Sequence, residues 1–293
     1  MNELSKNSEA PTPHLKTDTE LTSSVGYTCI GGRTEDQDCL AYYEVNGHQI
    51  FTVCDGMGGH AGGCVASALA AKTMTESLSH QSDTISISEA IVAAVSDANS
   101  VVYRKSQEEP SLRGMGTTIT LLVINNEAAY VTHIGDSRVY QLRSGRKVFR
   151  TFDHSMVFEQ VARGNLTEEE ARQNPRSNIL SRALGVLPDI EVKVNKLEYR
   201  KGDRFVLCCD GVWNTQPEQD VISMFTASED LETTVMSTRS TVEEIGKNAG
   251  GHHDNHTMIA VDLKHNSKYR KSVWSKILTR LTKLFNCEKH QRS

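Results

Sequence analysis

The sequence lacks the segments that mark membrane and secreted proteins. Its 293 residues contain no run approaching the roughly 18 apolar residues of a membrane-spanning helix. The N-terminus does not place a basic segment before an apolar one, which is the order found in a signal peptide. We therefore expect a cytoplasmic protein.

The sequence also lacks the spacings typical of disulfide frameworks and zinc sites. Its seven cysteines are odd in number and include no CxxC pair, so we expect reduced thiols in apolar stretches. No histidine pair forms a HExxH-like helical zinc motif, and several histidines lie in strand-like stretches. We therefore expect core or surface roles for His133, His154, His252, His253 and His256.

Charge is divided unevenly along the chain. Residues 264–293 contain nine lysines and arginines and one glutamate, a net charge of +8. Because the whole chain carries −5, residues 1–263 carry −13. Such an acidic body repels nucleic acid, and bound cations would account for part of the excess.

The chain divides into three parts. Residues 1–22 are polar with almost no apolar periodicity, which predicts a disordered leader. Residues 23–263 contain the regular patterns and are expected to form one catalytic domain. Residues 264–293 form a basic extension, in which apolar residues recur on one face of a predicted helix.

Strand patterns come first, and two long helical patterns follow them. Strands are expected from Val25, at LAYYEV and at QIFTVCDG, with a hairpin turn at Asn46-Gly47. Helical spacing follows over residues 62–78 and 88–105. Three further strands, TTITLLVIN, EAAYVTHIG and SRVYQLRSG, then form a meander.

The remaining pattern combines helices with shorter strands. We expect an exposed helix over 155–173 with a capping box at Thr167 and Glu170, and another helix over 231–248. Strands are expected over 190–197, 204–209 and 257–263. The pattern predicts an α+β fold, a four-layer α/β/β/α sandwich of two antiparallel sheets with helices on both outer faces.

Four acidic segments have a similar local pattern although they are far apart in the chain. They are RTEDQD from Arg33, DGMGGH from Asp55, CDGVW from Cys209 and DNHT from Asp254. In three of them the aspartate lies at the end of an apolar, strand-like run, where its carboxylate can enter a cleft. A site of aspartates without His or Cys ligands is typical of Mg²⁺ or Mn²⁺, so the segments predict a metal-dependent hydrolase.

The segments, in this order, resemble the metal-dependent Ser/Thr protein phosphatases of type 2C, bacterial branch. The resemblance covers about residues 24–263 and depends on GGRTEDQD, VCDGMGGHAGG, GMGTT, HIGDSRVY, FDHS, SRALG, CCDGVW and DNHT. It implies the same β-sandwich flanked by helix pairs. It also implies hydrolysis of phosphoserine and phosphothreonine at a binuclear Mn/Mg centre, with attack on phosphorus by a bridging hydroxide and no phosphoenzyme.

The resemblance implies a role for each matching residue. Asp55 would bridge two metal ions with the Gly56 carbonyl as a further ligand, and Asp210 and Asp254 would complete the second ion's shell. Asp38 would orient metal-bound water. Here the sequence departs from the usual Asn-Glu-Asp form: Asp36 is interpreted as a surface substitution, and Gln37 cannot supply a carboxylate.

Three further residues carry open interpretations. Arg33 would bind phosphate through its guanidinium fork, the alternative being an exposed arginine in a turn. Asp136 would help Asp210 hold a third metal ion, or would cap a turn. His60 would be the general acid for the leaving oxygen, or a structural histidine. Residues 152–181 correspond to a flap near the active site, where substrate contacts differ between members.

The partners follow from the same resemblance. We expect phosphorylated protein substrates, an opposing Ser/Thr kinase and a monomeric enzyme that does not bind nucleic acid. No cysteine is followed by arginine six positions later, so the Cys-x5-Arg loop of the covalent phosphatases is absent. The rival interpretations are a two-metal phosphodiesterase and a catalytically weak metal-binding regulatory relative. The 264–293 extension would contact a membrane surface, an acidic partner or its own domain.

Overall fold

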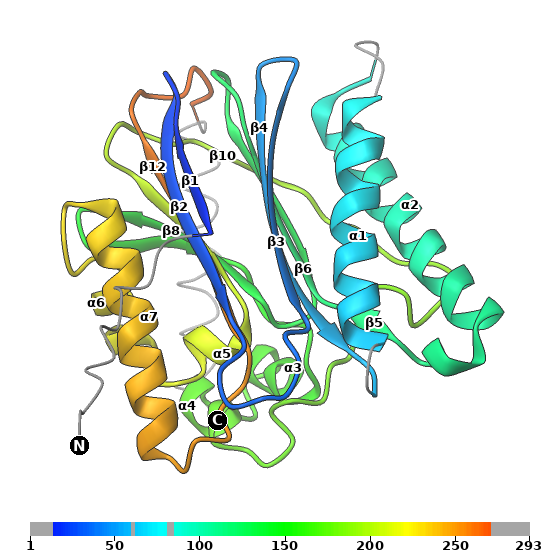
Figure 1. The fold of residues 1–293 in the computed structure, drawn as a ribbon. Helices are drawn as coiled ribbons and strands as arrows, with labels where there is room; N and C mark the ends of the chain where they lie inside the picture. Colours follow the sequence, from blue (N-terminus) through cyan, green and yellow to red (C-terminus); the bar gives the residue numbers. More distant parts are fainter. Residues whose placement is uncertain (1–13, 60–61, 81–84, 271–293) are drawn as a thin grey trace, which may run out of the picture.

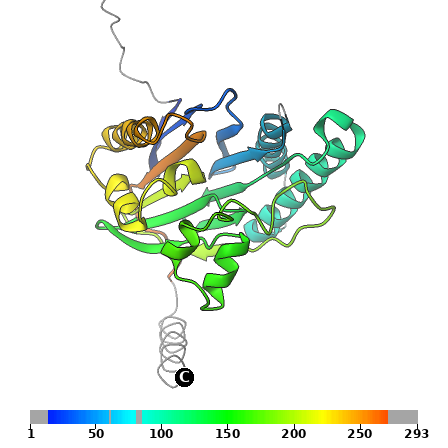
Figure 2. The ribbon, with the colours of Figure 1, turned by 90° about the horizontal axis from the view of Figure 1, so that it is seen from below.

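The computed structural model describes residues 14–59, 62–80 and 85–270. Two antiparallel sheets pack face to face, with helices on both outer sides (Figures 1 and 2). The predicted four-layer α+β sandwich is confirmed. Among the described residues, no helix combines the length and apolarity needed to cross a bilayer.

The first sheet brings together strands from both ends of the domain. Its strand order is β1-β2-β12-β11-β8-β9, and every neighbouring pair is antiparallel. In that order the strands are Leu15–Asp18, Thr22–Cys29, His256–Leu263, Arg204–Cys208, Arg138–Arg143 and Arg146–Arg150.

The second sheet comes mainly from the first half of the domain. Its order is β10-β7-β6-β4-β3, and a short strand, β5, pairs with the end of β4. The six strands, with β5 last, are Asn195–Leu197, Ala129–Ile134, Ile119–Ile124, His48–Met57, Asp38–Val45 and Gly116–Thr117.

The helices cover the two outer faces and one end of the sandwich. Helices α1 (Gly62–Ser79) and α2 (Ile87–Glu108) lie beside the second sheet, and a 3-10 turn, η1 (Pro110–Leu112), follows them. Helices α6 (Glu218–Phe225) and α7 (Leu231–Asn248) lie beside the first sheet. Three short helices lie near the lower end in Figure 1: α3 (Met156–Ala162), α4 (Glu168–Arg172) and α5 (Asp210–Trp213).

Strand β6 shows why the sheets form two hydrophobic layers. All six of its residues are buried, because one face meets the other sheet and the opposite face meets the helices. Leu122 and Ile124 belong to the core between the sheets, whereas Leu121 and Val123 belong to the core beneath α1 and α2. Side chains alternate along a strand, so one apolar run serves both layers.

Several predicted elements are confirmed with small shifts. The Asn46-Gly47 turn joins β3 to β4, and both residues have positive φ, 51° and 72°, as a two-residue hairpin turn requires. Helices α1, α2 and α7 and the strands of the meander lie where the periodicity placed them. Helix α2 begins at Ile87, because Ser86 and Glu89 form a capping box.

The prediction for residues 155–173 was wrong in one respect. The segment contains two helices, because α3 ends at Ala162 and Gly164 then takes a φ of 77°. The predicted capping box of Thr167 and Glu170 is present, but it begins the second helix, α4. Strand 190–197 was predicted too long, since only β10 pairs with β7, and β9, α5 and α6 were not predicted.

The boundaries of the domain also need correction. Residues 14–22 belong to the fold and not to a disordered leader, because β1 pairs with β2 along its whole length. Leu15 packs on the core, while Lys16 forms an ion pair with Glu232. At the other end the fold continues past 263, since the Ser267 amide donates to Tyr199 and the Lys268 amide to Asn126. Residues 1–13 and 271–293, including the predicted amphipathic helix, lie outside the described residues.

A buried ion pair fixes the turn between β7 and β8. Arg138 donates two hydrogen bonds to Asp153, at 2.8 and 2.7 Å, and its guanidinium carbon lies 3.3 Å from the centre of the Trp213 ring. Trp213 in turn donates its indole N–H to the carbonyl of Asp136, at 2.9 Å. The GDSR and FDHS segments are therefore joined by one charge pair.

We predict that Asp153→Asn destabilises the protein by about 3–5 kcal/mol, because Arg138 would remain buried without its counter-charge. The free energy of unfolding from urea denaturation checks this. Glu127→Gln is the matched control, because its pair with Lys268 is exposed on both sides and should contribute less than about 1 kcal/mol. Equal effects of the two substitutions would contradict the assignment.

Candidate metal centre

Most of the acidic residues meet in one cavity. The cavity has a volume of about 920 Å³. Strands β2, β11 and β12 of the first sheet and β3 and β4 of the second end or begin beside it. Its walls include six of the residues singled out in the sequence: Arg33, Asp55, Gly56, Asp136, Asp210 and Asp254.

Asp38 and Asp55 face one another across the β3–β4 ladder, where they are register partners. The Cys209 thiol donates to one oxygen of Asp38, at 3.2 Å, and the donor atoms of these three residues lie within 4.8 Å of one another. The other oxygen of Asp38, Oδ1, is buried without a hydrogen-bond partner. An unpartnered anionic oxygen beside a second carboxylate is the environment that a bound cation would satisfy.

Burial and mutual repulsion raise the pKa of the clustered carboxyl groups. Burial, and then repulsion from Asp36 and Asp210, raises the pKa of Asp38 to about 8. Burial and Asp254 raise the pKa of Asp210 to about 6. Burial raises the pKa of Asp55 well above its usual range, and Asp38, Asp210, Asp136 and Asp254 add to the effect in that order.

Asp136 belongs to the same electrostatic group. Burial raises its pKa well above the usual range, with a further contribution from Asp210. It follows Gly135, whose φ of 96° produces the tight turn after β7. These carboxylates can be ionised together only if positive charge enters the cavity, and oxygen donors of this kind fit a hard divalent cation.

Arg33 contributes a cationic side chain to this group. Its Nη2 lies 2.8 Å from Oδ2 of Asp254, and both side chains are about half exposed, at 54% and 44%. The guanidinium therefore lies at the mouth of the cavity, where a ligand can reach it. The structure therefore places Arg33 beside the candidate metal ligands and not in an isolated turn.

Gly56 is required by close packing of the backbone. A Cβ at this position would lie 2.1 Å from the carbonyl oxygen of Gly63 and 2.6 Å from that of Gln37. The end of β4 therefore touches both the start of α1 and the loop before β3. No side chain fits between them, which explains the Asp-Gly sequence better than a simple turn does.

Asn255, Asp36 and Cys209 have roles that the sequence analysis missed. The side-chain amide nitrogen of Asn255 donates to the backbone carbonyls of Ile30 and Glu35, at 2.8 and 2.9 Å. Its side-chain oxygen accepts from the backbone N–H of Gln37, at 3.0 Å. It therefore holds the loop that carries Arg33. The position of Asn255 inside the DNHT segment was the available signal.

Asp36 is not a surface substitution as the sequence analysis interpreted it. Its side chain accepts from the Thr28 hydroxyl, at 2.7 Å, and from the Asp38 amide, at 3.2 Å. These contacts stabilise the turn immediately before Asp38. Gln37 lines the cavity, and His60 lies outside the described residues.

The predicted flap contributes one wall of the cavity. Asn178, Leu180 and Ser181 line it, followed by Arg182, Val186 and Leu187. Met156 and Ile179 form a backbone hydrogen bond, which joins the start of α3 to the segment after α4. Polar, apolar and charged side chains of this segment therefore face the space beside the carboxylates.

Comparison with known proteins gives a consistent result. The sequence model of the family described as Protein phosphatase 2C matches residues 25–258. A serine/threonine phosphatase, stp, of Listeria monocytogenes is 30% identical over 242 residues, which cover 81% of this chain and 94% of the relative.

Two solved structures show the same architecture. The serine/threonine phosphatase PstP/Ppp of Mycobacterium tuberculosis is 30% identical, with a TM-score of 0.71 over 84% of this chain and 100% of the other. A PstP catalytic domain solved in complex with two manganese ions is 27% identical, with a TM-score of 0.71 over 83% and 99%. Because the family model spans most of the chain and the fold agrees, this protein belongs to the protein phosphatase 2C family of metal-dependent serine/threonine phosphatases.

Proposed function

We propose that this chain hydrolyses phosphoserine and phosphothreonine in proteins at a two-cation centre, and that it reverses the action of a Ser/Thr kinase. The observation that carries the proposal is the cavity in which carboxylates from both sheets raise one another's pKa. That arrangement is unfavourable for a metal-free protein and suited to one that binds divalent cations.

The ligand roles are those that the family resemblance implies, and most of the residues concerned line the cavity. Asp55 lies at the centre of the group, since four other aspartates act on its pKa, and it would contact both cations. Gly56 would add its carbonyl, Asp210 and Asp254 would hold the second cation, and Asp38 would orient water. Asp136 would serve a third, weaker site with Asp210. The manganese-bound relative supports Mn²⁺, with Mg²⁺ as the other candidate.

The two cations, when bound, would supply a hydroxide at neutral pH and neutralise charge on the phosphate. In-line attack of that hydroxide needs no protein nucleophile. Cys209, the cysteine nearest the site, agrees with this, because burial raises the pKa of its thiol well above the usual range. Cys209 positions Asp38 instead, through its hydrogen bond.

Arg33 would bind the phosphate of the substrate. Its guanidinium now contacts a single oxygen of Asp254, so further N–H groups remain to bind a phosphate oxygen pair. His60 would protonate the leaving oxygen, as proposed from the sequence. We also propose that the enzyme is monomeric and acts on phosphoproteins, and that the 264–293 extension contacts a membrane surface, an acidic partner or its own domain.

Activity on a phosphothreonine peptide tests the proposal directly. We expect hydrolysis with Mn²⁺, none with chelator, and a loss of about 10³-fold in kcat for Asp55→Asn, since a bridging ligand contributes several kcal/mol to charge stabilisation. Asp97→Asn, an exposed aspartate on α2, is the matched control and should retain activity. Cleavage of phosphodiesters alone would support a phosphodiesterase, and no cleavage would support a regulatory relative.

Arg33→Lys tests the phosphate contact. Lysine keeps the charge but loses the paired N–H donors, so kcat/KM should fall roughly 10- to 100-fold at saturating Mn²⁺. Arg104→Lys, at an exposed position on α2, controls for a general effect of the exchange. An unchanged kcat/KM in Arg33→Lys would remove Arg33 from the phosphate site.

The raised pKa of Asp38 predicts how the metal-free protein responds to pH. The group keeps its proton up to about pH 8 when folded but loses it near pH 3.8 when unfolded, so the folded state binds more protons between these values. Unfolding free energy should therefore fall as pH rises from about 7 to 8. His133, His154 and His256 have lowered pKa values in the folded state and contribute in the opposite direction, but that contribution is mostly complete by about pH 7, because their ordinary value is 6.5.

Thermal denaturation in chelator measures this dependence. The melting temperature of the metal-free protein should be lower at about pH 8 than at about pH 7, and Asp38→Asn should reduce the difference. A melting temperature that rises over this range in the wild-type protein would show that Asp38 is ionised in the folded state.

A further inference from the structure

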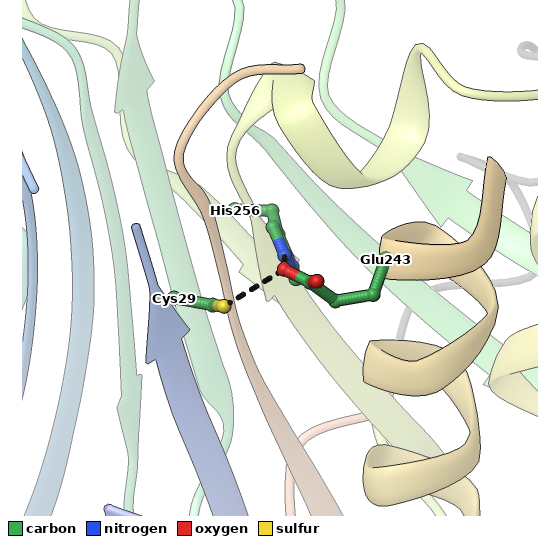
Figure 3. A group of neighbouring side chains, drawn as sticks. All are labelled: Cys29, Glu243 and His256. Atoms are coloured by element: carbon green, nitrogen blue, oxygen red, sulfur yellow. Dashed lines mark hydrogen bonds and ion pairs between the residues drawn. The ribbon is translucent and has the colours of Figure 1, made fainter. Parts of the chain in front are cut away.

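A second group of metal-type donors lies outside the catalytic cavity. Cys29 at the end of β2, Glu243 in α7 and His256 at the start of β12 point toward one another (Figure 3). None of the three lines the cavity. Their donor atoms all lie within 4.8 Å of one another, although 214 positions separate Cys29 from Glu243 in the chain.

Three donor atoms surround a single carboxylate oxygen, Oε1 of Glu243. Oε1 of Glu243 lies 3.1 Å from the Cys29 sulfur, 3.1 Å from Nε2 of His256 and 3.4 Å from Nε2 of His253. In a tetrahedral site with bonds of about 2.0–2.3 Å, neighbouring ligand atoms are roughly 3.3–3.8 Å apart. The three contacts of Oε1 are within a few tenths of an ångström of that spacing.

The surroundings resemble the outer contacts of a metal site. His256 is completely buried, and its Nδ1 lies 3.1 Å from the Tyr27 hydroxyl, which fixes the ring. The second oxygen of Glu243 pairs with Lys247 at 2.8 Å, so Oε1 alone faces the cluster.

Hydrogen bonds alone satisfy the donor and acceptor atoms of these side chains less completely than a bound cation would. In that arrangement one carboxylate oxygen accepts hydrogen bonds from a thiol and two imidazoles. Nδ1 of His253 is buried without a hydrogen-bond partner. A divalent cation would replace the thiol proton, leaving a thiolate and a carboxylate whose two negative charges match it. Arg239, 3.9 Å from the sulfur, would contact the thiolate from outside.

We propose that Cys29, Glu243 and His256 bind one zinc-class cation, with His253 or water in the fourth position. Sulfur and imidazole donors select Zn²⁺ or Co²⁺, whereas the oxygen donors of the cavity select Mn²⁺ or Mg²⁺, so one chain would hold two chemically distinct centres. The sequence analysis gave His256 a core or surface role, because no histidine pair forms a HExxH-like helical motif.

The site would connect the two segments that carry Arg33 and Asp254. Cys29 lies four positions before Arg33, and His256 two positions after Asp254. Helix α7 would hold both strand ends through Glu243. A cation here would support the mouth of the cavity without touching substrate, so its role is structural.

Cobalt spectroscopy of the full chain separates this site from the catalytic centre. We use a Cys64→Ser/Cys287→Ser background, which removes the exposed Cys64 and the cysteine outside the described residues. Metal-free protein titrated with Co²⁺ should develop a thiolate-to-cobalt charge-transfer band and the intense visible bands of four-coordinate Co²⁺. A six-coordinate oxygen site gives neither.

Adding Cys29→Ser to this background should abolish the charge-transfer band and weaken Co²⁺ binding by at least about 100-fold, more than loss of an outer contact costs. Glu243→Gln keeps the shape of the side chain and should also weaken binding. Zn²⁺ should displace the cobalt bands and raise the melting temperature of the background protein, but not that of the Cys29→Ser protein. His253→Asn tests the fourth position, and only a loss of affinity assigns it to His253.

Two results would overturn the proposal. The first is the absence of a charge-transfer band in the background protein, which would leave Cys29, Glu243 and His256 as a hydrogen-bonded group. The second is a band that persists after Cys29→Ser, which would assign the sulfur ligand to Cys209 beside Asp38. Mn²⁺-dependent hydrolysis by each variant shows that it is folded.

Discussion

Repulsion among carboxylates at one end of the sandwich is the constraint on which the rest of this structure depends. Asp38, Asp55, Asp136, Asp210 and Asp254 come from both sheets, and each additional one raises the pKa of Asp55 further. The fold must stabilise this arrangement from outside. It does so with two apolar layers, a backbone contact at Gly56 and a buried ion pair at Arg138.

Much of this could be predicted from the sequence, because local pattern and local structure agree. The apolar runs along β4 and β6, the turn at Asn46-Gly47 and the helical spacing of α1 and α2 are properties of short segments. The acidic site could be predicted for a related reason. Each aspartate lies at the end of an apolar strand, and the ends of strands packed in two sheets meet at an edge.

The rest could not be predicted, because it depends on partners that are distant in the chain. Residues 15–18 appear too polar for a strand, and only the unpaired edge of β2 makes them one. Cys209 and Asn255 have no signature of their own, since their roles come from Asp38 and from the loop after Ile30. The cluster at His256 was missed for the same reason: its three donors come from a strand, a helix and another strand.

The Asn255 side chain has a wider consequence for the geometry of the cavity. One amide group holds the 30–37 loop at three backbone positions, and its own backbone directly follows Asp254. The separation between the arginine and the aspartate is therefore inherited from the β2–β12 ladder and not from the conformational preferences of the loop. The placement of this rim is therefore set by strand register, in which His256 pairs with Cys29 directly beside it.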